Sequence, residues 1–358
     1  MVPFKNFAIG ATPRKAALII AESEESIQES YDTGKKWPLP HGSLSEAVLK
    51  STGTVRTVRT LAKPRDAEAE ALKQEVAIMK TLDHVNILQL LEVFEDAKSV
   101  YLVTEHCPGG MLQQALTRLE HFSEAHTATL MRQLFRVVRH VHERRLCHRN
   151  LAMNCLLLAT AGEVNTESVL KVGGFNMASK FDDDTPLREP CGAVGYMAPE
   201  VIDKEYSSPC DLWSCGVIMF YMLCGYLPFT GESDQEVMRE CHRGAFFFHP
   251  VNWGKISDSA KELIRYLLKR RASQRCTAVQ ALHHEWFKGP KRHMDAAALK
   301  GLGGETKAID ELATDISTSD LGALDLELDA DPAVEDDLRS PIHVNSSFKP
   351  TLLMGDVA

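Results

Sequence analysis

The sequence lacks several features that would assign it to a common functional class. Its 40 Lys and Arg residues are outnumbered by 49 Asp and Glu residues, so it has no basic excess of the kind that nucleic-acid-binding proteins carry. None of its nine cysteines forms a Cys-x-x-Cys pair, which argues against a disulfide or zinc framework and favours a reduced protein. We therefore expect an intracellular, cytoplasmic protein, with the nucleus as the alternative, and no nucleic-acid partner.

Long apolar runs are also scarce. The first residues, Met1-Val2-Pro3-Phe4, begin no apolar run of signal-peptide length, and Val2 in place of glycine excludes N-myristoylation. The 18 residues 212–229 are apolar enough to resemble a membrane span, but they sit at the lower length limit and include glycine and proline. We predict a buried core helix there and no membrane span.

The net charge of −9 is concentrated near the C-terminus. Residues 305–339 contain twelve acidic and two basic residues, a net charge of −10, whereas the rest of the chain carries +1. No aromatic residue occurs between Phe287 and Phe348, and the acids alternate with small apolar residues. Such a composition predicts a disordered acidic tail over residues 289–358.

Apolar patterns divide the preceding chain into a strand-rich part and a helix-rich part. Ser51-Thr52-Gly53 lies between two β-type runs, 47–49 and 55–61, which predicts a hairpin. A further strand is predicted at 100–103. Apolar spacing predicts helices over residues 16–29, 66–82, 121–143, 212–223, 233–242, 257–268 and 277–286. Strands followed by helices are typical of a two-lobed α+β protein.

Five motifs occur in the order in which protein kinases carry them. Residues 198–200 read Ala-Pro-Glu, and His148-Arg149-Asn150-Leu151 resembles the kinase catalytic loop with one letter changed. The other three motifs occupy residues 82–87, 101–105 and 211–217. The chain thus resembles the protein kinase family over about residues 31–288, and is most similar to the calcium-dependent kinases.

This resemblance implies a bilobal, α+β protein-kinase-like fold. We expect an N-terminal extension over 1–30 and a kinase-like domain over 31–288, with a β-rich N-lobe (31–105) and a larger helical C-lobe (109–288). Calcium-dependent kinases usually continue into EF-hands. This chain has no Asp-x-Asp-x-Asp-Gly loop, so we expect no direct calcium binding.

The glycine-rich loop that covers the phosphates in the family is not conserved in this sequence. Counted back from Val48, its three glycines are replaced by His41, Ser43 and Glu46, and Gly42 is out of register. Side chains at these positions would obstruct a close approach of the backbone to phosphate groups. We interpret the segment as a plain hairpin.

The nucleotide-binding lysine of the family aligns with Arg59, and its partner on the small-lobe helix aligns with Glu75. Arginine keeps the charge but is not interchangeable with lysine, so we expect an ion pair that holds the helix. Adenine contacts are largely made by backbone, so a remnant pocket is expected. By the resemblance it comprises Val48, Thr57, Arg59, Glu75, Thr104, Glu105, Cys107 and Leu157.

The resemblance also implies that the metal ligands, the catalytic base and the catalytic-loop lysine of the family are absent. Gly174 stands at the aspartate of the Asp-Phe-Gly triplet and Cys155 at the second metal ligand, so neither supplies the oxygen that magnesium prefers. Asn150 replaces the catalytic base, and an amide cannot accept the proton of a substrate hydroxyl. Ala152 replaces the catalytic-loop lysine. We expect no functional catalytic residue, no bound metal and no cofactor, and regard rescue by the acidic loop 182–184 as the minor alternative.

The residues that hold a kinase fold together are retained. Glu200 and Arg275 match the buried ion pair of the helical lobe, and Asp211 matches the anchor of the catalytic loop. The stack that links the lobes matches Met79, Leu90, His148 and Phe175, and Arg149 is assigned a structural role with them. Two substrate-facing positions have changed, to Met111 and Ala193.

These observations predict a pseudokinase, a kinase-like domain with absent or severely impaired catalysis that acts as a scaffold or allosteric regulator in kinase signalling. Its partner would be another protein, an active kinase or its substrate. One alternative is a weakly active or unconventional serine/threonine kinase that binds ATP without magnesium. A second is an interaction protein acting through its tail, where Ile309, Leu312 and Ile316 would form an apolar face.

Overall fold

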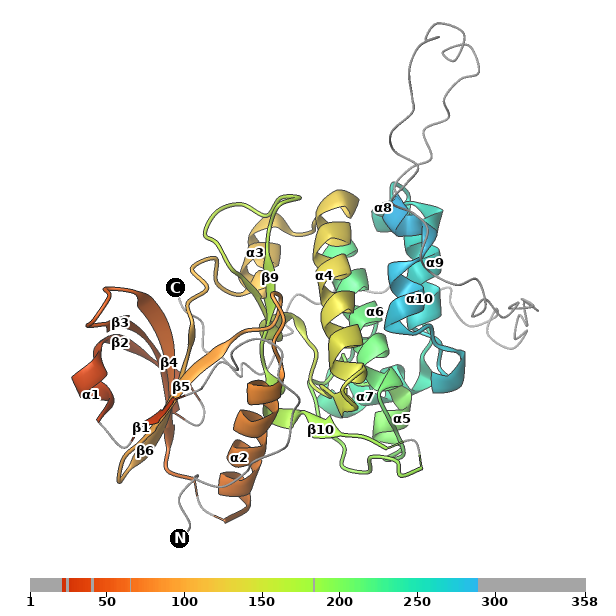
Figure 1. The fold of residues 1–358 in the computed structure, drawn as a ribbon. Helices are drawn as coiled ribbons and strands as arrows, with labels where there is room; N and C mark the ends of the chain where they lie inside the picture. The colour runs from red at the N-terminus through yellow and green to blue at the C-terminus, as the bar shows by residue number, and fades with distance from the viewer. Residues whose placement is uncertain (1–20, 24–25, 40–41, 65, 183, 289–358) are drawn as a thin grey trace, which may run out of the picture. The chain divides into compact units, whose positions relative to one another are not determined.

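The computed structural model describes residues 21–23, 26–39, 42–64, 66–182 and 184–288 (Figure 1). These residues form the two-lobed α+β fold that the sequence predicts, a sheet-based N-lobe followed by a helical C-lobe. The predictions for residues 1–20, His41, Asp183 and the tail 289–358 lie outside the described residues.

The N-lobe is built on a six-stranded sheet in the order β1-β5-β6-β4-β3-β2. Strand β1 runs parallel to β5, and all other pairs are antiparallel. The predicted hairpin joins β3 and β4 and pairs Val48 with Val55. The elements are β1 (Ala21–Ser23), α1 (Ile27–Ser30), β2 (Tyr31–Leu39), β3 (Gly42–Leu49), β4 (Val55–Ala62), α2 (Asp66–Thr81), β5 (Leu90–Glu95) and β6 (Ser99–Glu105).

The start of the sheet differs from the sequence prediction. A helix was predicted over residues 16–29, but 21–23 form strand β1 and helix α1 begins only at Ile27. Pairing with β5 gives the backbone of β1 the hydrogen-bond partners that a helix would otherwise supply. Ile27 and Tyr31, each 2% exposed, pack with Val58 in the small-lobe core. Folded structure therefore begins before residue 31.

The C-lobe is mainly helical, with short strands near the junction of the lobes. Its elements are α3 (Leu112–Leu119), α4 (Glu124–His142), β7 (Leu146–Cys147), η1 (Met153–Cys155), β8 (Leu156–Leu158), β9 (Leu170–Val172), η2 (Phe175–Met177), β10 (Ser179–Lys180), α5 (Pro199–Ile202), α6 (Pro209–Cys224), α7 (Asp234–Arg243), α8 (Pro250–Trp253), α9 (Asp258–Leu267), η3 (Ala272–Gln274), α10 (Ala278–Leu282) and η4 (Glu285–Lys288). Strands β8 and β9 pair with each other, as do β7 and β10.

Helices α4 and α6 form the centre of the C-lobe (Figure 1). Helix α4 begins at the cap Ser123, whose hydroxyl accepts from the His126 amide, and it buries the apolar face predicted from its spacing. Helix α6 is the predicted buried helix, and it ends at Gly225, which has a φ of 82°. Among the described residues, no helix is long and apolar enough to cross a membrane.

The helix predicted over 277–286 is interrupted. Helix α10 ends at Leu282, and the short helix η4 starts at Glu285. The break lets Trp286 donate from its indole nitrogen to Glu124 of α4 at 2.9 Å. The backbone carbonyl of Phe287 accepts from Arg132 at 2.7 Å. These contacts attach the end of the segment to α4.

Candidate functional site

Residues of the predicted nucleotide pocket lie where three strands of the sheet meet the short strands of the C-lobe. Val48 lies on β3 and Thr57 on β4, and Thr57 is paired with Thr104 of β6. Leu157 lies on β8 and bridges to Met111, while Cys107 follows the end of β6. Burial raises the pKa of the Cys107 thiol to about 11. The thiol is therefore protonated at neutral pH.

The ion pair predicted between β4 and α2 is formed. Arg59 Nη1 lies 2.7 Å from Glu75 Oε1, and the Glu75 side chain is 6% exposed. Arg59 is more open, with 30% of its side chain exposed. Gln74 of the same helix donates to the carbonyl of Ala178 in the C-lobe at 3.3 Å. Helix α2 is thus attached both to the sheet and to the segment that follows position 174.

A polar contact that sequence reasoning missed links the sheet to the residue after β6. His106 Nδ1 lies 3.1 Å from the hydroxyl of Thr57, and its Nε2 lies 4.0 Å from Glu46 Oε1. Glu46 and Thr57 are direct cross-strand partners. Glu46 and Thr57 replace, respectively, a loop glycine and the small alanine that the family has there. No local pattern signalled the role of His106, because its direction depends on the strand register.

A second missed residue is Lys171 of β9. Its Nζ lies 2.7 Å from Glu105 Oε2, and the amide of Gln89 donates to Glu105 Oε1 at 2.8 Å. The two side chains are 14% and 22% exposed, so the pair is largely removed from water. The carboxylate of Glu105 is therefore held by partners within the protein.

The two positions that hold metal in the family contact each other in this chain. Gly174 has a φ of 81°, and a β-carbon built on it would lie 2.6 Å from Cys155 Sγ. The thiol of Cys155 is buried and donates to the carbonyl of Asn150 at 3.1 Å. Burial raises the pKa of Cys155 to about 12, so the group is a neutral thiol at neutral pH. A thiol and a bare α-carbon do not fit magnesium, which takes oxygen ligands in near-octahedral geometry.

The acidic loop suggested as a rescue lies apart from this contact among the described residues. Asp182 and Asp184 are exposed, and Asp182 Oδ1 accepts from the amide of Asp184 at 3.3 Å. Asp183 lies outside the described residues. The two described aspartates therefore behave as a solvated turn.

The catalytic-loop positions are buried. Asn150 is 6% exposed and Ala152 is 2% exposed. A cavity of about 10 Å³ lies beside Asn150 and is also lined by Ala193 and Tyr196. That volume holds about one water molecule. Within this loop, no side-chain carboxylate occupies the aligned base position.

The predicted anchor of the catalytic loop is in place. Asp211 Oδ2 accepts from the amide of His148 and Oδ1 from that of Arg149, both at 2.9 Å. Burial by itself would raise the pKa of Asp211, but the hydrogen bond and charge of His142, at 2.8 Å, hold it below its usual value. The carboxylate therefore stays ionised and fixes the loop backbone.

One contact of the stack predicted between the lobes, that of His148 with Phe175, is formed. His148 packs on Phe175 with ring centroids 4.6 Å apart, and its Nε2 lies 2.9 Å from the Gly173 carbonyl. Burial lowers the pKa of His148. The ring is therefore neutral, and its Nε2 donates to that carbonyl. Met79 and Leu90 belong to the same buried core as Phe175.

The predicted ion pair of the helical lobe is bidentate. Arg275 Nη1 donates to Glu200 Oε1 at 2.6 Å and Nη2 to Oε2 at 3.1 Å. Arg275 Nη1 also donates to the carbonyl of Pro209 at 2.7 Å, and its guanidinium lies 5.3 Å from the Trp213 ring. Its side chain has no exposed surface. The pair ties the Ala-Pro-Glu segment to the start of α6.

Arg149 connects the catalytic loop to the segment that follows position 174. Its Nε donates to the carbonyl of Met177 at 2.6 Å and its Nη1 to the hydroxyl of Tyr206 at 3.1 Å. Nη1 also lies 3.7 Å from Glu189 Oε2. The contacts agree with the structural role expected for this arginine.

Comparison with known proteins places the chain in a family. The model of the protein kinase domain matches residues 40–287. "Calcium-dependent protein kinase 3" of Plasmodium yoelii yoelii is 36% identical over 271 residues, covering 74% of this chain and 49% of that protein. "Calcium-dependent protein kinase 5" of Plasmodium falciparum (isolate 3D7) is 35% identical over 273 residues, covering 75% and 47%. The chain spans about half the length of these curated relatives.

These matches agree with the geometry already described. The matched region contains the Arg59–Glu75 pair, the Asp211 anchor and the Glu200–Arg275 pair. It also contains Cys155 and Gly174, which the sequence resemblance aligns with metal-holding positions. This chain belongs to the protein kinase family, and its relatives include calcium-dependent protein kinases.

Proposed function

We propose that this chain is a pseudokinase, which binds another protein as a scaffold or allosteric regulator in kinase signalling. The contact between Cys155 and position 174 carries the proposal. Kinases depend on metal ions to neutralise the charge that develops during phosphoryl transfer. Neither residue supplies an oxygen ligand, and the sulfur lies where the β-carbon of an aspartate would require space.

The catalytic loop supports the same proposal. Asn150 stands at the base, and loss of a general base costs roughly 10²–10⁴-fold in rate. Ala152 offers no charge to the transferring phosphate. Because these groups act as a unit, their losses do not simply multiply, but each removes a separate part of the machinery.

The contacts of Glu46 extend the argument to the nucleotide itself. Its carboxylate stands at a loop glycine and approaches His106, which also contacts Thr57. A negative charge at this position repels phosphate groups. The imidazole of His106 adds bulk beside the residues that would cover an adenine ring. We expect weak nucleotide binding or none.

The retained ion pairs support a role in binding. Removing one partner of a buried pair such as Glu200–Arg275 typically costs about 3–5 kcal/mol, because the other charge is left unpaired in the interior, and both partners are present in this chain. A stable kinase-like surface is then available to a true kinase or its substrate. We propose no direct calcium response, since the sequence contains no Asp-x-Asp-x-Asp-Gly loop.

A phosphorylation assay tests the main proposal. The full chain is incubated with radiolabelled ATP, magnesium or manganese, and a peptide library, beside a Glu75→Gln variant. We expect equal background transfer from both proteins, because any signal would come from a contaminating kinase. Transfer by the wild type that disappears in a variant of unchanged melting midpoint would overturn the proposal.

The alternative, an unconventional serine/threonine kinase that binds ATP without magnesium, is favoured by one observation. The Arg59–Glu75 pair is formed at 2.7 Å, so a cation is positioned where the family's lysine meets the phosphates. A ligand that binds only the native state raises the melting midpoint. A melting midpoint that rises with millimolar ATP in the presence of EDTA supports this alternative. An unchanged midpoint contradicts the metal-free ATP binding that the alternative requires.

The second alternative assigns binding to the acidic tail. The net charge of −10 over residues 305–339 is its support. Capture of partners by the full chain is compared with capture by a chain lacking residues 295–358. Binding that survives the deletion locates the partner surface on the kinase-like domain, and binding that is lost locates it in the tail.

A further inference from the structure

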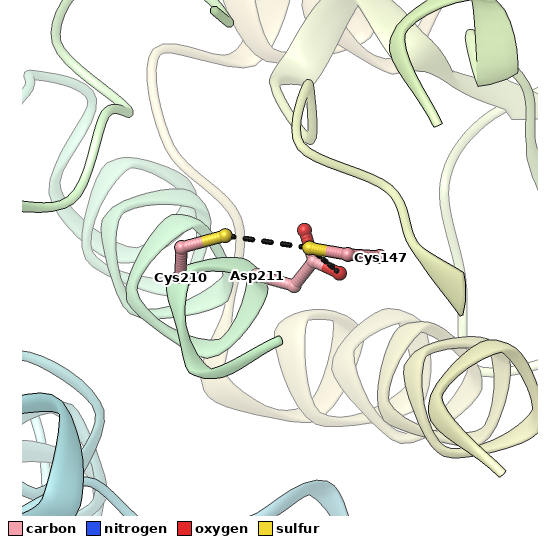
Figure 2. Close-up of side chains that lie close together, drawn as sticks. All are labelled: Cys147, Cys210 and Asp211. Carbon is pink, nitrogen blue, oxygen red and sulfur yellow. Dashed lines mark hydrogen bonds between the residues drawn. The ribbon is translucent and has the colours of Figure 1, made fainter. Parts of the chain in front are cut away.

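Two cysteines that lie 63 residues apart in the sequence contact each other where strand β7 ends, directly before the catalytic loop. Cys147 ends β7, and Cys210 and Asp211 lie in the first turn of α6. Cys147 Sγ lies 3.4 Å from Cys210 Sγ and 3.4 Å from Asp211 Oδ2. Figure 2 shows the three side chains pointing toward one another. Their three possible ligand atoms all lie within 4.8 Å of one another.

We propose that Cys147, Cys210 and Asp211 bind a zinc ion. Zinc accepts thiolate and carboxylate ligands at about 2.3 Å and about 2.0–2.2 Å. In a tetrahedral site these lengths separate two sulfurs by about 3.8 Å and a sulfur from an oxygen by about 3.5 Å. The separations of Cys147 Sγ from Cys210 Sγ and from Asp211 Oδ2 are both 3.4 Å, within a few tenths of an ångström of these values. The third separation, between Cys210 Sγ and the Asp211 carboxylate, lies within 4.8 Å.

The carboxylate of this site is already oriented by fixed donors. Asp211 accepts from the amides of His148 and Arg149, and His142 Nε2 lies 2.8 Å from its Oδ2. Hydrogen-bonded partners of this kind orient metal ligands and are part of a working site. They also prevent Asp211 from turning away when an ion enters.

Zinc binding adds no net charge to the protein interior. Both cysteines are buried, which favours the neutral thiols, so without a metal ion the cluster carries the single charge of Asp211. A zinc ion replaces the two thiol protons, and the net charge of the cluster remains −1. The large cost of burying an additional unpaired charge is thereby avoided.

The cavity of about 10 Å³ that borders Asn150 is also lined by Cys210, but not by Cys147 or Asp211. A zinc ion with three protein ligands usually takes a water molecule as its fourth ligand. The ion would join the residue before His148 to helix α6, and so stabilise the folded chain.

The experiment uses the full chain with its cysteines reduced, freed of metal and then given one equivalent of zinc. Metal content after gel filtration and the melting midpoint are measured for the wild type, Cys147→Ser, Cys210→Ser and Cys215→Ser. Cys215 is a buried cysteine of the same helix outside the cluster, so its variant is the matched control. Cobalt is added in place of zinc to detect thiolate-to-cobalt absorption.

We expect one zinc per chain and a raised midpoint for the wild type and Cys215→Ser. Both cluster variants should bind at least about 100-fold more weakly, because loss even of a residue that only orients a ligand costs about 10–100-fold. The thiolate-to-cobalt band should be lost with them. Less than a tenth of an equivalent of zinc on the wild type, equal binding by all four proteins, or a Cys147–Cys210 disulfide formed in place of zinc binding would overturn the proposal.

Discussion

At the residue scale, Cys155 and Gly174 are complementary in shape as well as in chemistry. The sulfur of Cys155 takes up the space that a side chain at 174 would need, and the φ of 81° at 174 is one that glycine adopts without strain. The cysteine at position 155 therefore explains why position 174 tolerates only glycine. The sequence shows two missing metal ligands, but their contact emerges only from the fold.

Restoring the aspartate alone should destabilise the domain. In Gly174→Asp the new β-carbon meets Cys155 Sγ, and overpacking of this kind costs about 1–3 kcal/mol. Urea unfolding followed by fluorescence measures the loss. The double variant Cys155→Ala/Gly174→Asp should recover much of it, because the sulfur is gone. A single variant as stable as the wild type would contradict the packing argument.

A second residue-scale prediction concerns the buried ion pair. Arg275→Met leaves Glu200 without its partner in the interior and should cost about 3–5 kcal/mol. Arg188→Ala serves as the control, because the Arg188–Glu205 pair is 70% and 68% exposed and such pairs contribute about 0–1 kcal/mol. Urea midpoints of the two variants are compared. Equal losses would show that the burial of the first pair has no energetic consequence.

At the scale of elements, the packing of helix α6 against α9 outweighs the intrinsic preference of a helix for alanine over glycine. Gly216 lies inside the helix, where alanine is normally favoured by about 1 kcal/mol. A β-carbon at 216 would lie 2.8 Å from Leu267 Cβ of α9 and 2.8 Å from Leu268 Cδ2. The close approach of α6 to α9 therefore depends on the absence of a side chain.

Gly216→Ala is accordingly expected to destabilise the protein. The expected loss is about 1–3 kcal/mol from overpacking, reduced by the gain in helix propensity. Thermal and urea unfolding of the variant measure the net effect. Stability equal to or above that of the wild type would mean that α9 moves away without cost.

Helix and strand positions were largely predictable from periodicity and turn residues. The predicted helices 66–82 and 121–143 correspond to α2 and α4, and the hairpin at Ser51-Thr52-Gly53 joins β3 to β4. The predicted helices at 16–29 and 277–286 were wrong in part, because contacts with β5 and α4 decide the conformation there, and α3 was not predicted. Local patterns do not contain such distant partners.

At the scale of the whole domain, buried histidines make stability depend on pH. Burial lowers the pKa of His84, His148 and His284, and lowers that of His140 to about 4, with nearby arginines adding to the effect at His84 and His140. These imidazoles are neutral in the folded state, so the unfolded chain binds more protons below the ordinary histidine pKa of 6.5.

Stability should therefore fall as the pH drops from about 6.5 toward 4. It should also fall as the pH rises above the ordinary cysteine pKa of 9.0, because the unfolded chain then releases thiol protons that buried cysteines such as Cys107 and Cys155 retain. The lowered pKa of Asp211 adds a further loss only below its usual value of 3.8. Urea midpoints measured at intervals across this range provide the test. His140→Gln should reduce the slope between pH 6.5 and 4, and a flat wild-type profile would contradict the prediction.

The sequence by itself determined the family resemblance and the two-lobed α+β class, and it predicted which catalytic positions are altered, because each depends on residue type in a local motif. Only the tertiary structure decided that Cys155 fills the space beside Gly174, that His106 joins Glu46 to Thr57, and that Cys147 meets Cys210. Each of these contacts joins residues between 19 and 63 positions apart in the sequence. Such contacts depend on strand register and helix packing, which involve the whole domain at once.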